Sequence, residues 1–228
     1  AAAAWPNTIK LFEAENTTAK PKSLTTPFEL ITHLGFSFDG QWLTLLGVTK
    51  DQRGLVQFRT PSGELKREVE INAQPFCAAF SPDSQTLAIG QNDGSIWFIP
   101  VNSQNKPRTL PEHHRDRIAT LSWSPDGQSL FSASMDKQSK VTAVNEKASN
   151  PLTLDLGSTA LLVFDGQKLI SGNQLRTLTA RNPTNGEILA TSPRFDTGTQ
   201  IGDIHDHKAL SNNAHTVVAG DFPGVYII

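Results

Sequence analysis

The sequence has a single cysteine, a single methionine and a single tyrosine among its 228 residues. One cysteine, Cys77, excludes an internal disulfide and a four-cysteine zinc site. No apolar run approaches the roughly 20 residues of a membrane-spanning helix, so we expect no membrane insertion. The formal net charge is −2, which gives no strong field for nucleic acid or an anionic membrane. We therefore expect a soluble, cytoplasmic globular protein with no nucleic-acid partner.

The common catalytic signatures are also missing from the sequence. It contains no Gly-x-Ser-x-Gly elbow, no P-loop and no His-Glu-x-x-His pattern. A Ser, His and Asp can be chosen from any chain of this size, so their presence alone indicates nothing. We expect a protein that is not an enzyme, with no catalytic residue and no cofactor.

Both ends of the sequence look interrupted. The chain begins with four alanines instead of methionine, and it stops within the apolar run Val225–Ile228. A strand cut at this point leaves its ladder groups unpaired. We expect one domain over residues 1–228, incomplete at both ends.

A repeat is the strongest positive signal. The segment Phe36–Gly40 (FSFDG) recurs as FSPDS, as WSPDG and, in a shortened, degenerate form, as FDG. The four aspartates are Asp39, Asp83, Asp126 and Asp165, separated by 44, 43 and 39 residues, and a further step of about 41 reaches Asp206. The sequence therefore predicts hairpin turns at these aspartates, including one at Asp206.

Short apolar runs follow these turns and are typical of strands rather than helices. Asp-Gly pairs supply the positive φ angles that tight hairpins need. The segment Gly63–Ile71 alternates apolar and charged residues, which favours an exposed outer strand. Four strands in about 40–45 residues is the period of a β-propeller blade.

The best unit, His114 to about Val144, resembles the WD40-repeat family. It has a histidine, an apolar strand, Ser-Pro-Asp-Gly, a strand containing serine, and an aspartate turn. The resemblance implies a buried structural relay of His114, Ser132 and Asp136. The tryptophan of the family relay falls on Thr142, so we expect an incomplete relay here.

The preceding unit departs further from the family pattern. It keeps the relay aspartate as Asp93 but has Ile71 where the histidine belongs. The resemblance implies an all-β fold, a WD40-like propeller of four-stranded antiparallel blades. About five blades are visible, and we favour a larger ring of seven blades, the usual number in the family. The style of the repeat suggests a bacterial source.

The sequence His205-Asp206-His207 is a candidate metal site, with His215 as a third ligand. Two histidines at i and i+2 share one strand face and can bind zinc. The repeat instead places Asp206 in a hairpin turn, and we favour that interpretation, with no metal bound.

The resemblance also points to a recognition surface, since family partners contact the start of the first blade strand and the residue before the turn aspartate. These positions fall on Asn72, Gln74, Asn92, Arg115, Arg117 and Met135. We expect a non-catalytic protein-interaction scaffold, a docking or sensor module of a larger bacterial protein or assembly, with protein partners. The alternative is a propeller enzyme, or one that binds a small ligand, with a polar site in the central channel.

Overall fold

Short antiparallel strands joined by tight turns make up the described part of the chain. The computed structural model describes residues 2–5, 8–11, 20–103, 105–144, 152–154, 159–164, 167–173, 178–183, 185–192, 207–210, 217–221 and 224–227. Within these ranges all regular structure is strand, which confirms the all-β prediction. None of the described segments is a helix long and apolar enough to cross a membrane. The chain divides into two compact units, Ala1–Pro111 and Glu112–Ile228.

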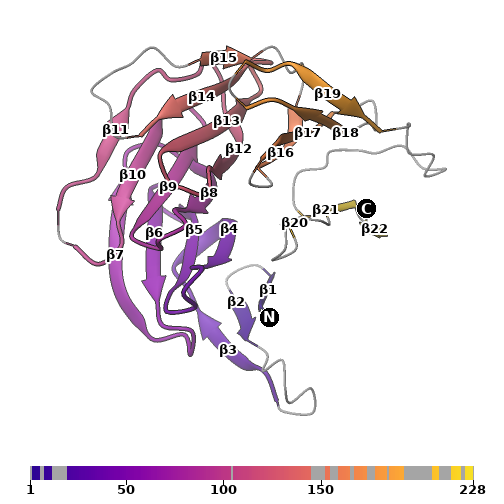
Figure 1. Ribbon diagram of the computed structural model, residues 1–228. Helices are drawn as coiled ribbons and strands as arrows, with labels where there is room; N and C mark the ends of the chain where they lie inside the picture. Colours follow the sequence, from indigo (N-terminus) through magenta and orange to yellow (C-terminus); the bar gives the residue numbers. More distant parts are fainter. Residues whose placement is uncertain are drawn as a thin grey trace. The chain divides into compact units, whose positions relative to one another are not determined.

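The first unit contains three antiparallel sheets (Figure 1). The N-terminal sheet has three strands: β1 (Ala2–Trp5), β2 (Thr8–Leu11) and β3 (Lys22–Thr25). The next has four: β4 (Phe28–Phe36), β5 (Leu43–Thr49), β6 (Gly54–Arg59) and β7 (Leu65–Ile71). The third also has four: β8 (Pro75–Phe80), β9 (Thr86–Gln91), β10 (Ile96–Pro100) and β11 (Arg108–Leu110). Strand β1 was not expected from its run of alanines.

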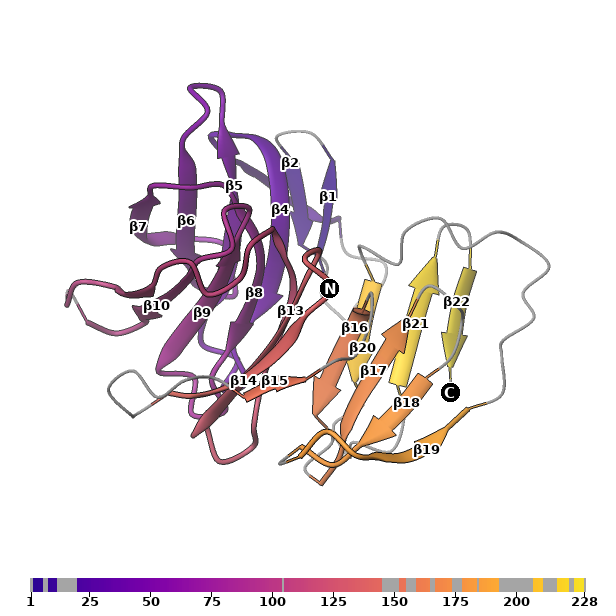
Figure 2. The same ribbon diagram turned by 90° about the horizontal axis from the view of Figure 1, so that it is seen from above.

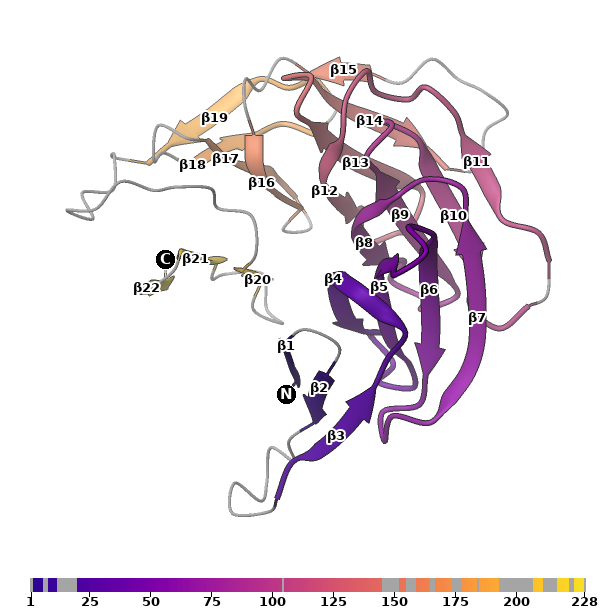
Figure 3. The same ribbon diagram turned by 180° about the vertical axis from the view of Figure 1, so that it is seen from behind.

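The core of the first unit lies between neighbouring sheets. The β-strand period of two sends alternate residues of β6 to opposite faces. Val56 and Phe58 pack with Ile89 and Ile99 of the β8–β11 sheet. Leu55 belongs to a separate apolar cluster that includes Ile9 of the N-terminal sheet. Strand β7 is the outer strand, and most of its residues are exposed or half-buried (Figure 3), which confirms the prediction for Gly63–Ile71.

The second unit repeats the pattern (Figure 2). One four-stranded sheet consists of β12 (Ile118–Trp123), β13 (Ser129–Ser134), β14 (Ser139–Ala143) and β15 (Leu152–Leu154). Another consists of β16 (Thr159–Phe164), β17 (Leu169–Asn173), β18 (Leu178–Arg181) and β19 (Ile188–Thr191). The last has three strands: β20 (His207–Leu210), β21 (Val217–Asp221) and β22 (Gly224–Ile227).

The predicted hairpin turn at Asp206 is wrong. Asp206 itself lies outside the described residues, but His207 already lies in β20 and pairs with Gly220 of β21, so a turn at Asp206 does not join these two strands. The regular spacing failed because β20 begins at His207 and β19 ends at Thr191, an interval longer than the one before the first strand of each other sheet.

Three of the predicted turns share one hydrogen-bond pattern. At Ser37, Ser81 and Ser124, the hydroxyl donates to the aspartate two residues on, at 2.5, 2.5 and 2.6 Å. The same hydroxyl accepts the N–H five residues on, at 2.9 Å each time. The residue after each aspartate has a positive φ angle, between 59° and 68°. The turn predicted at Asp165 lies outside the described residues.

Candidate functional site

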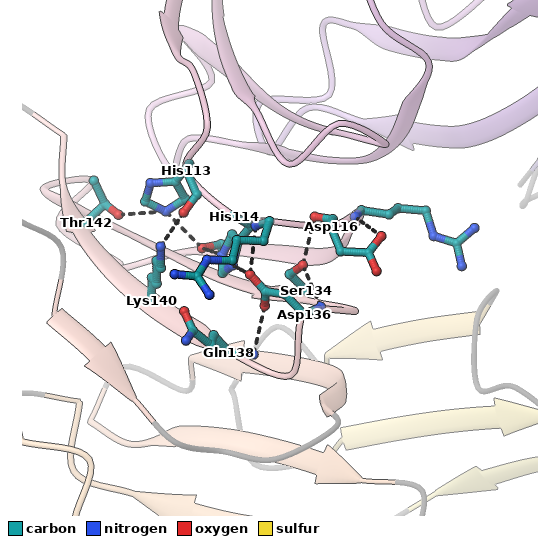
Figure 4. Close-up of polar contacts among 11 residues, drawn as sticks. His113, His114, Asp116, Ser134, Asp136, Gln138, Lys140 and Thr142 are labelled. Atoms are coloured by element: carbon teal, nitrogen blue, oxygen red, sulfur yellow. Dashed lines mark hydrogen bonds and ion pairs between the residues drawn. The ribbon is translucent and has the colours of Figure 1, made fainter.

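The side chains that the family resemblance selects meet at one end of the β12–β15 sheet. His114 precedes β12, Ser132 lies in β13, and Asp136 lies in the β13–β14 turn. His114 Nδ1 is 3.0 Å from Asp136 Oδ2 (Figure 4). His114 Nε2 is 2.8 Å from Ser132 Oγ. The His114 side chain is fully buried, and that of Asp136 is 7 % exposed. We call these three residues the relay.

His113 is a fourth member that sequence reasoning missed. Its Nε2 lies 3.3 Å from both Ser132 Oγ and Thr142 Oγ1, and its ring meets that of His114 edge-on at 5.0 Å between centroids. Lys140 Nζ donates a hydrogen bond to the His113 carbonyl (Figure 4). The small threonine at the tryptophan position is the signal that could have revealed it, since it leaves a hydroxyl for a second imidazole to contact.

Burial controls the protonation of both rings. It lowers the pKa of His113 from 6.5 to about 4, assisted by the charges of His114 and Lys140 and opposed by Asp136. Burial also lowers the pKa of His114, although the Asp136 carboxylate opposes the shift. Burial raises the pKa of Asp136. The N–H groups of Arg115 and Gln138 and the charge of His114 lower it by more, so the pKa lies below its ordinary value of 3.8. Both histidines are therefore neutral at neutral pH, facing an ionised aspartate.

The relay has the connectivity of a catalytic Ser–His–Asp triad, with Ser132 bonded to His114 and His114 to Asp136. Its burial argues against nucleophilic attack. Ser132 has no exposed surface, and its hydroxyl contacts both histidine rings. A catalytic serine must reach a substrate carbonyl, so this arrangement supports a structural role.

In the first unit, aliphatic residues of β7, β9 and β10 replace the same relay. Equivalent backbone hydrogen bonds align the two sheets and place Ile71, Ile89 and Ile99 at the positions of His114, Ser132 and Thr142. All three isoleucines belong to one buried apolar cluster. Within the part of the chain that the structure describes, Asp93 therefore has no histidine partner and accepts local bonds from the Ser95 N–H and hydroxyl, at 2.9 and 2.6 Å.

The recognition residues predicted in the second unit adjoin the relay residues in the chain and bond to the same turn. Arg115 is exposed, and its N–H donates to Asp136 Oδ2 at 2.9 Å. The Met135 N–H donates to the Arg117 carbonyl at 3.0 Å, and both residues are half-buried. The loop entering β12 and the β13–β14 turn thus form one continuous surface.

The corresponding residues of the first unit form a matching surface. Asn72, Gln74 and Asn92 are exposed. The Asn92 N–H donates to the Gln74 carbonyl at 3.0 Å, and the Gln74 N–H donates to Asn92 Oδ1 at 3.3 Å. The structure therefore brings together each loop–turn pair that the resemblance selected.

The predicted metal candidates are not brought together by what the structure describes. His207 begins β20, while His205 and His215 lie outside the described residues. In the described ranges no group of three His, Cys, Asp or Glu side chains is placed to hold a metal ion.

Comparison with known proteins identifies the repeat. Residues 104–141 match the family model "WD domain, G-beta repeat". Mouse WD repeat-containing protein 1 is 39 % identical over 87 residues, which is 37 % of this chain and 14 % of that protein. The yeast (Saccharomyces cerevisiae) COMPASS component SWD3 is 27 % identical over 71 % of this chain and 50 % of its own length. The Drosophila melanogaster LST8 homolog is 29 % identical over 55 % of this chain and 40 % of its own.

Structural comparison agrees with the sequence matches. A chain in the crystal structure of the mitotic checkpoint complex matches with a TM-score of 0.79, covering 99 % of this chain and 69 % of that one at 20 % identity. These findings confirm the predicted WD40-repeat resemblance and the propeller fold class of four-stranded blades. The chain spans half or less of the length of the relatives named above. Those relatives are eukaryotic, so the expected bacterial source has no support.

Proposed function

We propose that this chain, built from WD40-type blades, is a non-catalytic protein-interaction scaffold that serves as a docking module of a larger protein or assembly. Its recognition surface in the second unit consists of residues 112–117, which we call the recognition loop, together with Met135. The observation that carries the proposal is the Asp136 carboxylate. It bonds the backbone of the exposed Arg115 while it is itself held by the buried His114.

A recognition loop fixed in this way loses little conformational entropy on binding, and such preorganisation favours affinity. Arginine and methionine are enriched at protein interfaces, and a guanidinium can contact a carboxylate with two parallel hydrogen bonds. The β13–β14 turn adds the exposed Lys137 beside this surface. The chemistry therefore suits an acidic segment of a partner protein.

The relatives support an assembly role. The yeast relative is named a component of COMPASS, and the structural match comes from the mitotic checkpoint complex. Both names describe proteins that work within assemblies, which accords with a docking module here.

Selection from a displayed library of short random peptides at neutral pH tests the proposal. We expect selected peptides to be rich in Asp and Glu and to lose at least about tenfold in affinity when Arg115→Ala and Arg117→Ala are combined. Lys66→Ala, on the outer strand β7, removes an exposed positive charge elsewhere and is the matched control. Peptides that bind the double variant and the parent chain equally would refute the recognition surface.

The enzyme alternative is tested separately, because the relay resembles a hydrolase triad. We expect a fluorophosphonate probe, which labels activated serines, to leave Ser132 unmodified in the folded chain. Labelling that Ser132→Ala abolishes would establish a reactive serine and favour the enzyme.

A further inference from the structure

We propose that His113 and His114 form an acid-sensitive latch that holds the recognition loop in place at neutral pH and releases it on acidification. The latch comprises these two histidines with Ser132, Asp136 and Thr142. The proposal rests on the proposed function only in taking Arg115 and Arg117 as recognition residues; the loop's release is a property of the chain itself.

The hydrogen bonds of the latch determine which ring nitrogen of each histidine carries the proton. A carboxylate can only accept, so His114 carries its proton on Nδ1 and donates it to Asp136. His114 Nε2 is then a lone pair that accepts the single proton of the Ser132 hydroxyl. His113 must therefore carry its proton on Nε2, which faces the oxygens of Ser132 and Thr142. In this assignment the single Nε2 proton of His113 is shared between the Ser132 and Thr142 oxygens, and each of the other two contacts has a proton of its own.

An added proton disrupts this arrangement on either ring. On His114 it would occupy Nε2, and the Ser132 hydroxyl would lose the acceptor for its own proton. On His113 it would place a second charge beside Lys140, whose ammonium contacts the His113 carbonyl. The ionisable groups that act on the His113 ring are His114 on the same loop, Lys140 of β14 and Asp136 of the β13–β14 turn, and only Asp136 favours the charge.

The latch is coupled to the loop through shared atoms. Asp136 Oδ2 accepts from both His114 Nδ1 and the Arg115 N–H, at 3.0 and 2.9 Å. Ser134 Oγ donates to the Asp116 carbonyl at 2.8 Å. Withdrawal of the histidines therefore releases the part of the recognition loop before Asp116, whereas the Asp116 and Arg117 carbonyls keep their bonds from Ser134 Oγ and the Met135 N–H.

Acidification favours the released state because the two states bind protons differently. In the latched state burial keeps the pKa of both rings below 6.5, and that of His113 at about 4. A released loop exposes rings with the ordinary value of 6.5. The ratio of released to latched loop should then rise about tenfold per pH unit for each histidine as the pH falls through that range.

Backbone amide NMR of the whole chain tests the latch without any partner. We expect the Arg115 amide signal to shift or broaden between about pH 7 and about pH 5, the range in which a released histidine gains its proton. The Asn72 amide, which follows Ile71 as Arg115 follows His114, should not change and serves as an internal reference. In His113→Gln, which keeps a donor but cannot take up a proton, the transition should move to lower pH. His33→Gln, a histidine of β4 in the first unit, is the matched control.

An Arg115 amide that is unchanged down to about pH 5 would overturn the latch, since a free histidine is already mostly protonated there. If His113→Gln does not fold, the ring-proton titration of the parent chain decides: pKa values near 6.5 for both buried rings would overturn it equally. The peptide experiment separates the two proposals. An NMR transition without peptide binding retains the latch and rejects the recognition surface. Peptide binding that depends on the arginines, with an Arg115 amide signal that does not change with pH, retains the recognition surface and rejects the latch.

Discussion

Asp136 and Asp93 occupy the same turn position in consecutive sheets, yet they hold different partners. Asp136 accepts from a buried histidine and from the backbone of the recognition loop, whereas Asp93 accepts from Ser95 two residues on. The contribution of this aspartate therefore depends on what the blade places opposite it.

We expect Asp136→Ala to lower the free energy of unfolding by about 1–3 kcal/mol, because it leaves His114 buried without an acceptor. Asp93→Ala removes only local turn bonds at an exposed residue, and it should cost less than about 1 kcal/mol. Urea unfolding of the two variants measures the difference. Equal losses would mean that the relay adds nothing beyond the turn.

Most of the relay, but not all of it, could be predicted from the sequence. The resemblance selected His114, Ser132 and Asp136 because the family spacing places them at one end of a blade, and the structure brings them within hydrogen-bond distance. It did not select His113, since the family pattern expects tryptophan where Thr142 stands. Which of two consecutive histidines turns inward, or whether both do, depends on packing that the sequence does not display.

At the scale of the element, the hairpins with Ser-x-Asp turns were the most predictable part of the fold. Their bonds are local: the serine and aspartate contact each other and backbone within five residues. One longer bond joins two of these turns, from the Asp39 N–H to Ser84 Oγ at 3.1 Å. Ser84 has a positive φ of 59°, and glycines, Gly40 and Gly127, occupy the same position in the other two turns. Glycine adopts this conformation more easily than serine does, but only serine offers the hydroxyl for this contact. The prediction of a turn at Asp206 was wrong because the repeat does not determine how many residues separate one sheet from the next.

A second element-scale feature is the close approach of β4 to β5. A β-carbon at Gly47 would lie 2.1 Å from the Leu30 carbonyl oxygen and 2.9 Å from the Phe28 ring. Gly47→Ala should therefore cost about 3 kcal/mol or more, since backbone must move. Gly40→Ala is the control: its β-carbon meets nothing within 4 Å, and only its φ of 67° opposes it, at about 1 kcal/mol. Thermal melting compares the two, and a Gly47 variant as stable as the Gly40 variant would contradict the predicted clash.

At the scale of the whole molecule, the repeat predicted about five four-stranded blades because each repeat contains its own turns and strands, and the described residues form four four-stranded sheets and two of three strands. It did not predict β1, whose alanines carry no alternating pattern. It did place Ile71 where the histidine belongs, but it did not predict that Ile71, Ile89 and Ile99 would form one buried apolar cluster at the positions of the polar relay. The two units therefore differ in chemistry although they share a fold, and this difference should appear in their response to pH.

We expect mild acid to destabilise the second unit selectively. His113 and His114 bind protons less readily when folded than when unfolded, because burial lowers their pKa values. Protons therefore favour the unfolded state as the pH falls from above 6.5 toward 4. Allowing for solvent screening, His113 alone should cost about 1–2 kcal/mol between about pH 7.5 and about pH 5. The equivalent positions of the first unit are Ile71, Ile89 and Ile99, which do not titrate. Hydrogen-exchange mass spectrometry at both pH values, corrected for intrinsic exchange, should show lost protection in β12–β14 but not in β8–β10. Uniform loss across both groups of strands would locate the acid sensitivity outside the buried histidines.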